Sequence, residues 1–463
     1  MAQTPRPWTC YEDLQDFVDS LKATGDLIEI HESVDPRFEI GACLKTMGEK
    51  DGPAALFCHI VGFPGKKIVG NVMGHRRRLA KAFGVPEDGL VDHYLQRKRD
   101  RIPSIEVKEA PIKQVTLRGD DANLLRILPA LIHHEKDASP YLTCAVTFAR
   151  DCETGRQSMG MHRIQIQSHQ QMGICLETPP LARFLQKAWE RSKPLEAAVV
   201  IGPDPLVLVA SVTWCPEGED KIEIAGGLRG KPVEMVQCES VDLRVPAHAQ
   251  YVIEGRIHPQ EVAPEGIFGD SSGIYVEAQS PIIRVTSVSH RKEPIYQALQ
   301  TWSREDDALF DLCFGSDLLE EMRRPFPFVR DLYLIPGTVC GHVIISVAPC
   351  SKPMLRNAMV AALIRNPFVK IATFVDNDID IRNQSEVAWA VTTRFQADRD
   401  LVIVPGIQGT DIDPSASTEG ATCKMALDAT YMREQKRRFE KIDVPAESQK
   451  RVAEILKKVL PRS

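Results

Sequence analysis

Apolar and polar positions divide this 463-residue chain into stretches of different periodicity. Residues 1–111 open with apolar side chains spaced three and four apart, as in an amphipathic helix, and continue with short apolar runs bounded by glycine and proline. Helix and strand alternate here, which predicts an N-terminal α/β domain. Its last segment, 102–111, contains two prolines and is expected to be an extended connector.

Residues 112–299 have mainly the pattern of strands. The apolar runs 197–201 and 206–212 are separated by glycine, proline and aspartate, which predicts two buried strands joined by a turn. One amphipathic helix is expected at 180–191. Many strands with few helices predict a barrel-like or split-barrel β domain.

From residue 300 to 440 strands and helices alternate again, which predicts a C-terminal α/β domain. Residues 441–463 carry apolar side chains on one helical face and lysines on the other. This pattern predicts a C-terminal helix that docks on a neighbouring domain or on another subunit. The predicted fold class is therefore a multidomain α/β protein with a β-rich centre.

Composition narrows the possible classes of protein. Apolar residues make up 43% and charged residues 26%, as in soluble globular proteins, and the formal net charge of -6 favours no nucleic-acid partner. We find neither a signal peptide nor an apolar stretch long enough to span a membrane. The 12 cysteines form no Cys-x-x-Cys pair, so we expect a reduced cytoplasmic protein without a structural zinc or iron–sulfur site.

A glycine-rich segment, 263–273, is the densest candidate for chemistry. It places Glu265 and Asp270 five residues apart in what the composition predicts to be a loop. Paired carboxyls near an apolar wall can differ in pKa, so that one is ionised and the other delivers a proton. A surface turn with solvated acids is the alternative.

Two further segments carry clustered polar residues. A turn at 155–162 leads into a strand that begins at Arg163, whose guanidinium could hold a carboxylate or form a surface ion pair. The acidic segment 376–380 follows a buried strand. We expect it to be a turn that caps the helix starting near Ser385, with a metal site as the alternative.

In this order and over nearly the whole chain, these segments resemble the UbiD family of prenylated-FMN-dependent decarboxylases. The resemblance implies an N-terminal α/β domain, a central split β-barrel like that of flavin reductases, and a C-terminal α/β domain that helps form homodimers or hexamers. It is carried by His133–Asp137, Pro140–Thr143, Ile224–Gly230, Ala263–Gly273, Val375–Ile381, Val387–Ala390, Thr393–Arg394 and Asp413–Ala416.

The resemblance implies non-oxidative decarboxylation of an aromatic, heteroaromatic or α,β-unsaturated carboxylic acid, with the reverse carboxylation left open. Loss of CO2 from an sp² carbon needs an electron sink that no side chain offers, and a cofactor must supply it. The implied cofactor is prenylated FMN, made by a separate flavin prenyltransferase.

By similarity, Arg163 and Glu265 form an ion pair beside the cofactor and Asp270 is the acid or base. Some relatives have glutamate in place of Asp270, so the acid here is one methylene shorter. The residues expected to contact the cofactor are Ser158, Gly160, Met161, His162, Arg163 and Lys221.

Family members usually hold a divalent metal, manganese, at the cofactor phosphate, together with potassium. The positions of the three metal ligands are occupied here by Ser158, Leu181 and Lys221. Leucine cannot ligate a cation and an ammonium repels one, so we predict no metal site and expect Lys221 to neutralise the flavin phosphate. The alternative is that Lys221 faces solvent and Glu217 or Glu219 serves a cation.

Two other functions stay open. One is a flavin-binding member with an altered, metal-independent reaction, and the other is a catalytically silent subunit that assembles with an active paralogue. The presence of Arg163, Glu265 and Asp270 argues against a silent subunit, since no structural role requires all three.

Overall fold

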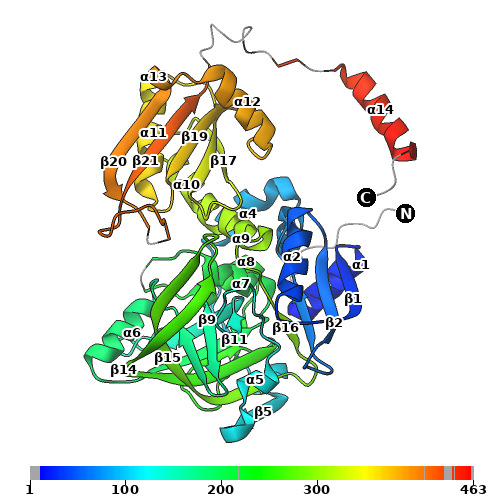
Figure 1. The fold of residues 1–463 in the computed structure, drawn as a ribbon, viewed down its shortest axis with the longest axis vertical. Helices are drawn as coiled ribbons and strands as arrows, with labels where there is room; N and C mark the ends of the chain where they lie inside the picture. The colour runs from blue at the N-terminus through cyan, green and yellow to red at the C-terminus, as the bar shows by residue number, and fades with distance from the viewer. Residues whose placement is uncertain are drawn as a thin grey trace.

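The computed structural model describes residues 11–216, 218–410, 412–431, 439, 441, 442 and 444–459. Figure 1 shows two lobes, of which the larger contains the N-terminal and central parts of the chain and the smaller contains the C-terminal part. In the described residues the strands form four sheets. The multidomain α/β prediction is confirmed.

The N-terminal sheet has the strand order β1, β2, β3, β16. Asp13 caps the first helix by accepting a hydrogen bond from the Asp16 amide, and the apolar face of this helix is buried as its spacing predicts. The last strand of the sheet comes from far along the chain, so the polypeptide returns here after the central part. The elements are α1 (Leu14–Ala23), β1 (Leu27–Val34), α2 (Glu39–Glu49), β2 (Ala54–Ile60), β3 (Lys67–Gly70), α3 (Arg76–Phe83), α4 (Leu90–Arg97) and β16 (Ile295–Gln297).

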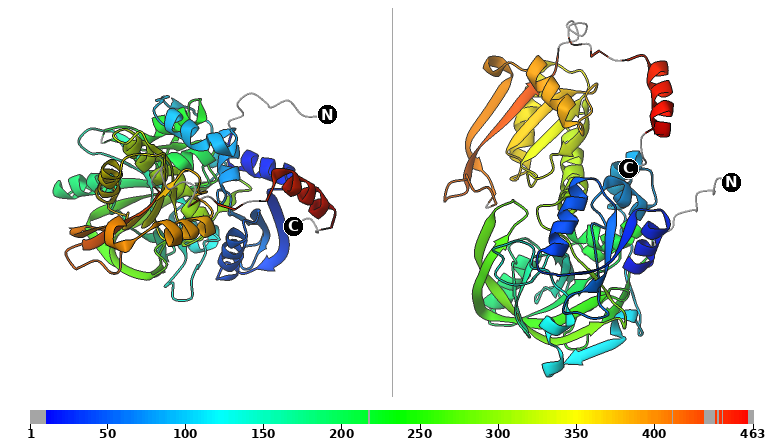
Figure 2. Two further views of the ribbon diagram at one scale, coloured as in Figure 1. Left: turned by 90° about the horizontal axis from the view of Figure 1, so that it is seen from above. Right: turned by 45° about the vertical axis from the view of Figure 1, so that its right-hand side comes forward.

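The central part is a curled sheet with the order β6, β9, β10, β15, β14, β11, β7, β8, and β5 pairs with β15. Figures 1 and 2 show its two longest strands, β14 and β15, curving together along one side of the larger lobe. This is the expected half-barrel. The strands are β5 (Val115–Arg118), β6 (Tyr141–Leu142), β7 (Ala145–Arg150), β8 (Gln157–Met161), β9 (Ile164–Ser168), β10 (Gln171–Ile174), β11 (Leu195–Ile201), β14 (Tyr251–Gly269) and β15 (Tyr275–His290).

The prediction of a strand at 206–212 is wrong, because these residues form helix α7 (Pro205–Val212). The carboxylate of Asp204 caps this helix and Pro205 occupies its first turn. Every side chain from 205 to 211 is buried, so the run has no polar face, and periodicity cannot distinguish such a helix from a buried strand.

The expectation of one helix in the central part is also wrong. α6 (Leu181–Glu190) lies where it was predicted, and α8 (Lys221–Arg229) follows α7. A three-stranded sheet of β13 (Arg244–Pro246), β12 (Glu234–Gln237) and β4 (Ile105–Glu106) joins the 102–111 connector to the central part.

The C-terminal lobe is a five-stranded sheet in the order β17, β18, β19, β21, β20, covered by helices. Helix α14 (Ala446–Val459) lies apart from this sheet in Figures 1 and 2, with Val452, Ile455 and Leu456 exposed. The other elements are α9 (Arg304–Phe310), a π-helical turn (Asp311–Gly315), α10 (Ser316–Arg323), β17 (Val329–Leu334), β18 (His342–Val347), α11 (Lys352–Arg365), β19 (Ile371–Asp376), α12 (Gln384–Arg394), α13 (Ala397–Asp400), β20 (Leu401–Gln408) and β21 (Ala421–Ala429).

The larger lobe and the C-terminal lobe have separate apolar cores. Phe17 of α1 and Phe148 of β7 belong to one core, and Phe57 of β2 and Tyr251 of β14 belong to a second, so the N-terminal and central parts are packed together through both. The C-terminal lobe has its own core around residues such as Phe374. The two lobes therefore fold around separate interiors.

The first turn of α9, residues 305–307, joins different parts of the chain through its carboxylates, and we call it the acidic turn. Glu305 accepts hydrogen bonds from the backbone amides of Asn71 (2.8 Å) and Met73 (2.7 Å) in the N-terminal part. Asp307 accepts from the Gly337 amide of the C-terminal lobe at 2.9 Å. Burial raises the pKa of Glu305 to about 7 and that of Asp307 to about 6.

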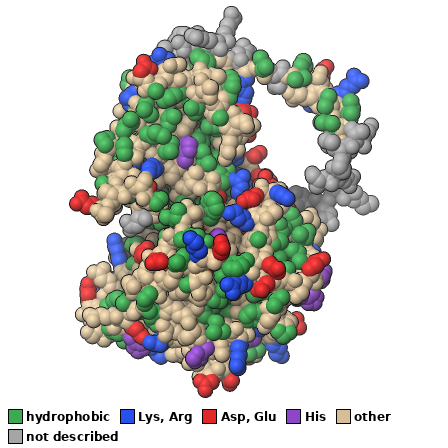
Figure 3. Space-filling view, viewed as in Figure 1, with side chains coloured by type: hydrophobic (Ala, Val, Ile, Leu, Met, Phe, Trp, Pro, Cys, Tyr) green, Lys and Arg blue, Asp and Glu red, His purple; other side chains and the backbone are tan. Residues whose placement is uncertain are grey.

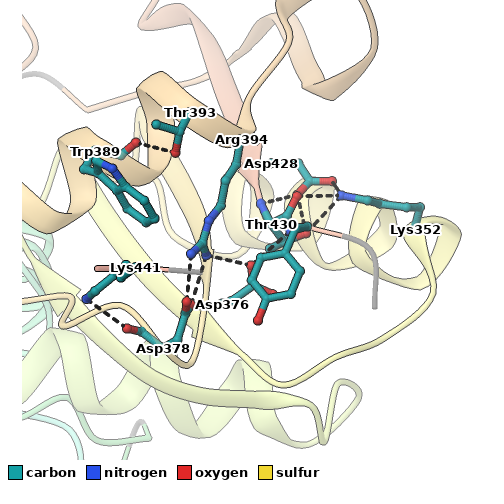
Figure 4. Close-up of polar contacts among 10 residues, drawn as sticks. Lys352, Asp376, Asp378, Trp389, Thr393, Arg394, Asp428, Thr430 and Lys441 are labelled. Carbon is teal, nitrogen blue, oxygen red and sulfur yellow. Dashed lines mark hydrogen bonds and ion pairs between the residues drawn. The ribbon is translucent and has the colours of Figure 1, made fainter. Parts of the chain in front are cut away.

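A buried arginine organises the end of β19. Arg394 donates to Asp376 at 2.9 Å and to Asp378 at 2.7 Å, as Figure 4 shows, and its guanidinium lies 5.0 Å from the ring centroid of Trp389 and 4.6 Å from that of Tyr431. Its side chain is fully buried. The acidic segment thus binds a guanidinium.

The cap of α12 is Asn383, which follows Arg382 after the acidic segment. The side chain of Asn383 accepts hydrogen bonds from the amides of Ser385 (3.1 Å) and Glu386 (3.4 Å). The expected helix start is therefore correct, but the acidic segment that precedes it does not supply the cap.

Replacing Arg394 by Met should lower the free energy of unfolding of the C-terminal lobe by about 3–5 kcal/mol, because Asp376 stays buried without its charge partner. Lys441→Met is the matched control. It removes a half-exposed pair with Glu386 and should cost less than about 1 kcal/mol. Urea unfolding of the full-length variants measures both, and equal losses would contradict a central role for Arg394.

Candidate active site

A cavity of about 1250 Å³ lies where the larger lobe meets the C-terminal lobe. Its walls come from β8, the start of α6, the α7–α8 connection, the residues after β14, and α9, with Phe368 and Ile412 from the C-terminal lobe. The face drawn in Figure 3 carries acidic and basic side chains interspersed, without an extended patch of one sign. Ligand sites of enzymes usually lie in concave, partly apolar cavities of this kind.

One end of the cavity is lined by β8 and the residues that follow it. Ser158, Gly160 and His162 alternate along the chain and share a face, as the pleat of a strand requires. The Ser158 hydroxyl and Nε2 of His162 are buried and have no hydrogen-bond partner among the described residues. Buried polar atoms of this kind need a partner, so this end is built to bind a polar group.

Lys221 faces the same end from the first residue of α8, which Asp220 caps. Its side chain is buried and its ammonium donates to the Ser211 carbonyl at 2.8 Å, which uses one of its three donors. Burial lowers the pKa of Lys221. Burial and the nearby Lys221 lower the pKa of His162 to about 4, so its imidazole is neutral at pH 7.

Carboxyl groups gather around Arg163, the residue that follows His162. Arg163 donates through Nε to Glu265 at 2.7 Å and through Nη2 at 3.3 Å, and its Nη1 lies 3.5 Å from Oδ1 of Asp270. The Ser280 hydroxyl donates to Glu265 at 2.6 Å. Burial alone would lower the pKa of Arg163, but the hydrogen bonds to Glu265 raise it overall. Arg163 is therefore a permanent cation between two carboxyls.

The peptide before Asp270 is held from both sides. The Gly269 amide donates to Asp137 at 2.7 Å, and the Gly269 carbonyl accepts from the Thr301 hydroxyl at 2.7 Å. Asp137 also accepts from the amides of residues 133–134 and its side chain is fully buried. Asp137 and Thr301 therefore fix the position of the turn that contains Asp270.

The structure brings most of the sequence-predicted residues to one cavity. Those that line it are Asp270, Ser158, Gly160, Met161, His162 and Lys221. Arg163 and Glu265 lie beside Asp270 as an ion pair. Lys221 is directed into the cavity, so the alternative in which it faces solvent is wrong.

The loop expected around Glu265 is instead the end of strand β14. Glu265 pairs with Ala278 of β15, and the register shifts between Glu265 and Phe268, where Gly266 lies. Only the residues after Gly269 form a turn. The carboxylate is thus placed by a sheet.

Leu181 does not line the cavity. It is fully buried in the apolar core beneath α6, and the cavity wall nearby is formed by Thr178, Pro179 and Pro180. Glu217 lies outside the described residues, and the Glu219 carboxylate pairs with Arg101. Across the described part of the chain, no three His, Cys, Asp or Glu side chains are grouped so as to hold a metal ion.

Two polar side chains of the site were not anticipated. Ser280 reaches Glu265 only because β14 and β15 pair in one register, which no local signal gives. Asp306 lines the cavity from the acidic turn. Three consecutive acids occupy residues 305–307, beside apolar residues. Carboxyl groups in such a place must be either solvated or bound by hydrogen-bond donors, so this pattern could have indicated Asp306.

Comparison with known proteins agrees with this architecture. Models of three domains of 3-octaprenyl-4-hydroxybenzoate carboxy-lyase match the chain: the N-terminal domain over residues 18–98, the Rift-related domain over 104–303 and the C-terminal domain over 313–429. The chain therefore belongs to the UbiD family, and its enzyme class is carboxy-lyase.

Relatives of established function span nearly the whole chain. Anhydromevalonate phosphate decarboxylase of Methanosarcina mazei is 30% identical over 438 residues, which cover 94% of this chain and 99% of that protein. HmfF from Pelotomaculum thermopropionicum, solved with FMN, has a TM-score of 0.91 at 35% identity and covers 96% of this chain and 100% of its own.

A third relative is an apo structure. Klebsiella pneumoniae 3,4-dihydroxybenzoic acid decarboxylase (AroY) has a TM-score of 0.87 at 26% identity, covering 93% of this chain and 97% of its own. The names of these proteins include both a benzoic acid and anhydromevalonate phosphate as substrates. Membership of the family therefore does not fix an aromatic substrate.

Replacing Asp137 by Asn should loosen the turn at 269–273, because an amide group cannot accept all three backbone hydrogen bonds that the carboxylate accepts. We expect hydrogen exchange of a peptide covering this turn to accelerate about tenfold or more. Asp121→Asn, an exposed acid, is the control and should leave exchange unchanged. Unaltered protection in the Asp137 variant would show that other contacts hold the turn.

Proposed function

We propose that this enzyme is a non-oxidative decarboxylase that uses prenylated FMN and acts on an α,β-unsaturated, aromatic or heteroaromatic carboxylic acid. The observation that carries the proposal is the grouping of Arg163, Glu265 and Asp270 beside one large cavity. The substrate of the Methanosarcina relative favours keeping unsaturated aliphatic acids beside aromatic ones.

The residues present fit such a cofactor. The unpartnered Ser158 hydroxyl, Nε2 of His162 and the free donors of the Lys221 ammonium converge on one end of the cavity, as a phosphate and its neighbouring hydroxyls would require. We propose that these side chains hold the flavin phosphate, with Lys221 in place of a divalent metal. When bound, the cofactor supplies the electron sink for loss of CO2.

Arg163, Asp270 and Glu265 perform the remaining tasks. Nε and Nη2 of Arg163 bind Glu265, which leaves Nη1 on the side of Asp270 to orient the substrate carboxylate. Asp270 then donates its proton to the carbon that has lost CO2. Glu265, held by Ser280, keeps the guanidinium in place throughout.

Several expectations about partners belong to the same proposal. A separate flavin prenyltransferase supplies the cofactor, and the protein assembles as a homo-oligomer, a dimer or hexamer. HmfF has been solved in an evolved dimeric form with prFMN.

Among the described helices, none has the length and apolar character needed to cross a membrane.

The test is cofactor analysis after co-expression with a flavin prenyltransferase, followed by a panel of unsaturated and aromatic acids. We expect mass spectrometry to show prenylated FMN, and Asp270→Asn to lower CO2 release by about 10² to 10⁴-fold with the cofactor content unchanged. Asp270→Glu should restore part of the rate. Plain FMN, or an active Asp270→Asn variant, would instead favour the altered-reaction alternative.

Lys221→Met should weaken cofactor retention about ten- to hundredfold, since a charged hydrogen-bond donor is lost from a buried site. Flavin titration of the apoprotein measures this. Lys66→Met, a partly buried lysine away from the cavity, is the control and should bind flavin normally. One tightly bound manganese per chain in the wild-type holoenzyme would refute the role proposed for Lys221.

A further inference from the structure

A second aspartate of the cavity wall, Asp306, lies close to Asp270. It is buried in the acidic turn of α9 and lines the same cavity. Its carboxylate accepts a hydrogen bond from the Ser271 side chain and another from the Trp302 amide at 3.3 Å. Ser271 directly follows Asp270 in the chain, and the charge of Asp270 acts on Asp306.

The charges of this wall do not balance if every acid is ionised. Glu265, Asp270 and Asp306 are three carboxyls, and the guanidinium of Arg163 is paired with the first two. Glu265 takes both hydrogen bonds on one edge of the guanidinium together with the Ser280 hydroxyl. Like charges this close in a buried site disfavour double ionisation, so a proton is retained among the acids.

The surroundings of Asp306 identify the acid that retains it. The titratable groups that face it are Asp307 on its own helix, Asp270 at the end of β14, and the thiols of Cys144 and Cys340. Burial first, and then the neighbouring Asp307 and Asp270, raise the pKa of Asp306 to about 7. Asp306 is therefore the natural store of a proton at neutral pH.

We propose that Asp306 and Asp270, which line the same cavity, form an acid pair in which Asp306 supplies the proton that Asp270 gives to the product carbon. This inference rests on the proposed decarboxylation. Asp306 gives its proton to a water molecule of the cavity as that water gives a proton to the Asp270 carboxylate. Asp270 passes this proton to the carbon that has lost CO2, and Asp306 is reprotonated from bulk water. Asp306 acts through Asp270 and is a positioning residue.

The proposal fixes the sign of the pH dependence. Below about pH 7 Asp306 carries its proton, and above it Asp306 ionises, so the decarboxylation rate falls as pH rises through this range. In Asp306→Asn the proton store and the negative neighbour of Asp270 are both lost. The falling limb of kcat should then move to lower pH by about one unit, with KM little changed.

The matched control is Asp311→Asn, which removes an acid of the adjacent π-helical turn that binds the Leu334 amide. It should leave the falling limb of the holoenzyme in place, and Asp306→Glu should restore the wild-type profile. A wild-type profile in Asp306→Asn, or the same displacement in the Asp311 variant, would overturn the acid pair.

Infrared titration of the holoenzyme separates this inference from the proposed function. The difference between wild type and Asp306→Asn should contain the carbonyl band of a protonated carboxyl that disappears near pH 7, whereas Asp311→Asn should retain it. A holoenzyme that shows the band but decarboxylates no acid would refute the proposed function and leave the proton store standing. Absence of the band would refute the proton store whatever the activity.

Discussion

The antiparallel pairing of β14 with β15 determines where the carboxyl end of the site lies. Glu265 is paired with Ala278, and Ser280 is two residues further along the same face of β15, so that its hydroxyl meets the Glu265 carboxylate. A register slip of one residue would turn Glu265 to the opposite face and leave Arg163 without its partner. Asp270 inherits its position from the same strand, because it follows the last paired residue, Gly269.

Buried acids are the main electrostatic cost of this architecture. The acidic turn uses each carboxyl to accept backbone or hydroxyl donors from a different part of the chain, which satisfies groups that would otherwise be orphaned at the junction of the lobes. Their pKa values rise because these contacts do not fully replace water. The acidic turn, which connects parts of the two lobes, therefore also supplies a titratable group, Asp306, to the cavity.

Local sequence signals were sufficient for much of the fold and for part of the site. The spacing of Leu14, Phe17 and Leu21 gave the first helix because its burial pattern is decided within a few residues. Family-like motifs gave the grouping of Arg163 and Asp270, although these residues are 107 apart in sequence, which no periodicity argument would supply. Where an element is apolar on all sides, as at 206–212, its type depends on tertiary packing and local patterns fail.

Two features of the site could not be placed from the sequence. Leu181 stands at a ligand position by resemblance, but the prolines before it, and not the leucine, reach the cavity. Asp306 was missed because its partner hydroxyl, Ser271, belongs to a different strand connection. Both depend on the three-dimensional course of the chain.

The division of the apolar interior has a consequence for how genes of this architecture can be recombined. The N-terminal and central parts share two cores, so a chimera joined in the 102–111 connector would have to match two foreign interiors at once. A junction after the π-helical turn, whose Leu312 and Cys313 still belong to the first core, separates the core of the C-terminal lobe from the others. Exchange of the C-terminal lobe between relatives is therefore the tolerated crossover, and it would renew the wall formed by Phe368 and Ile412 while keeping Arg163, Glu265 and Asp270.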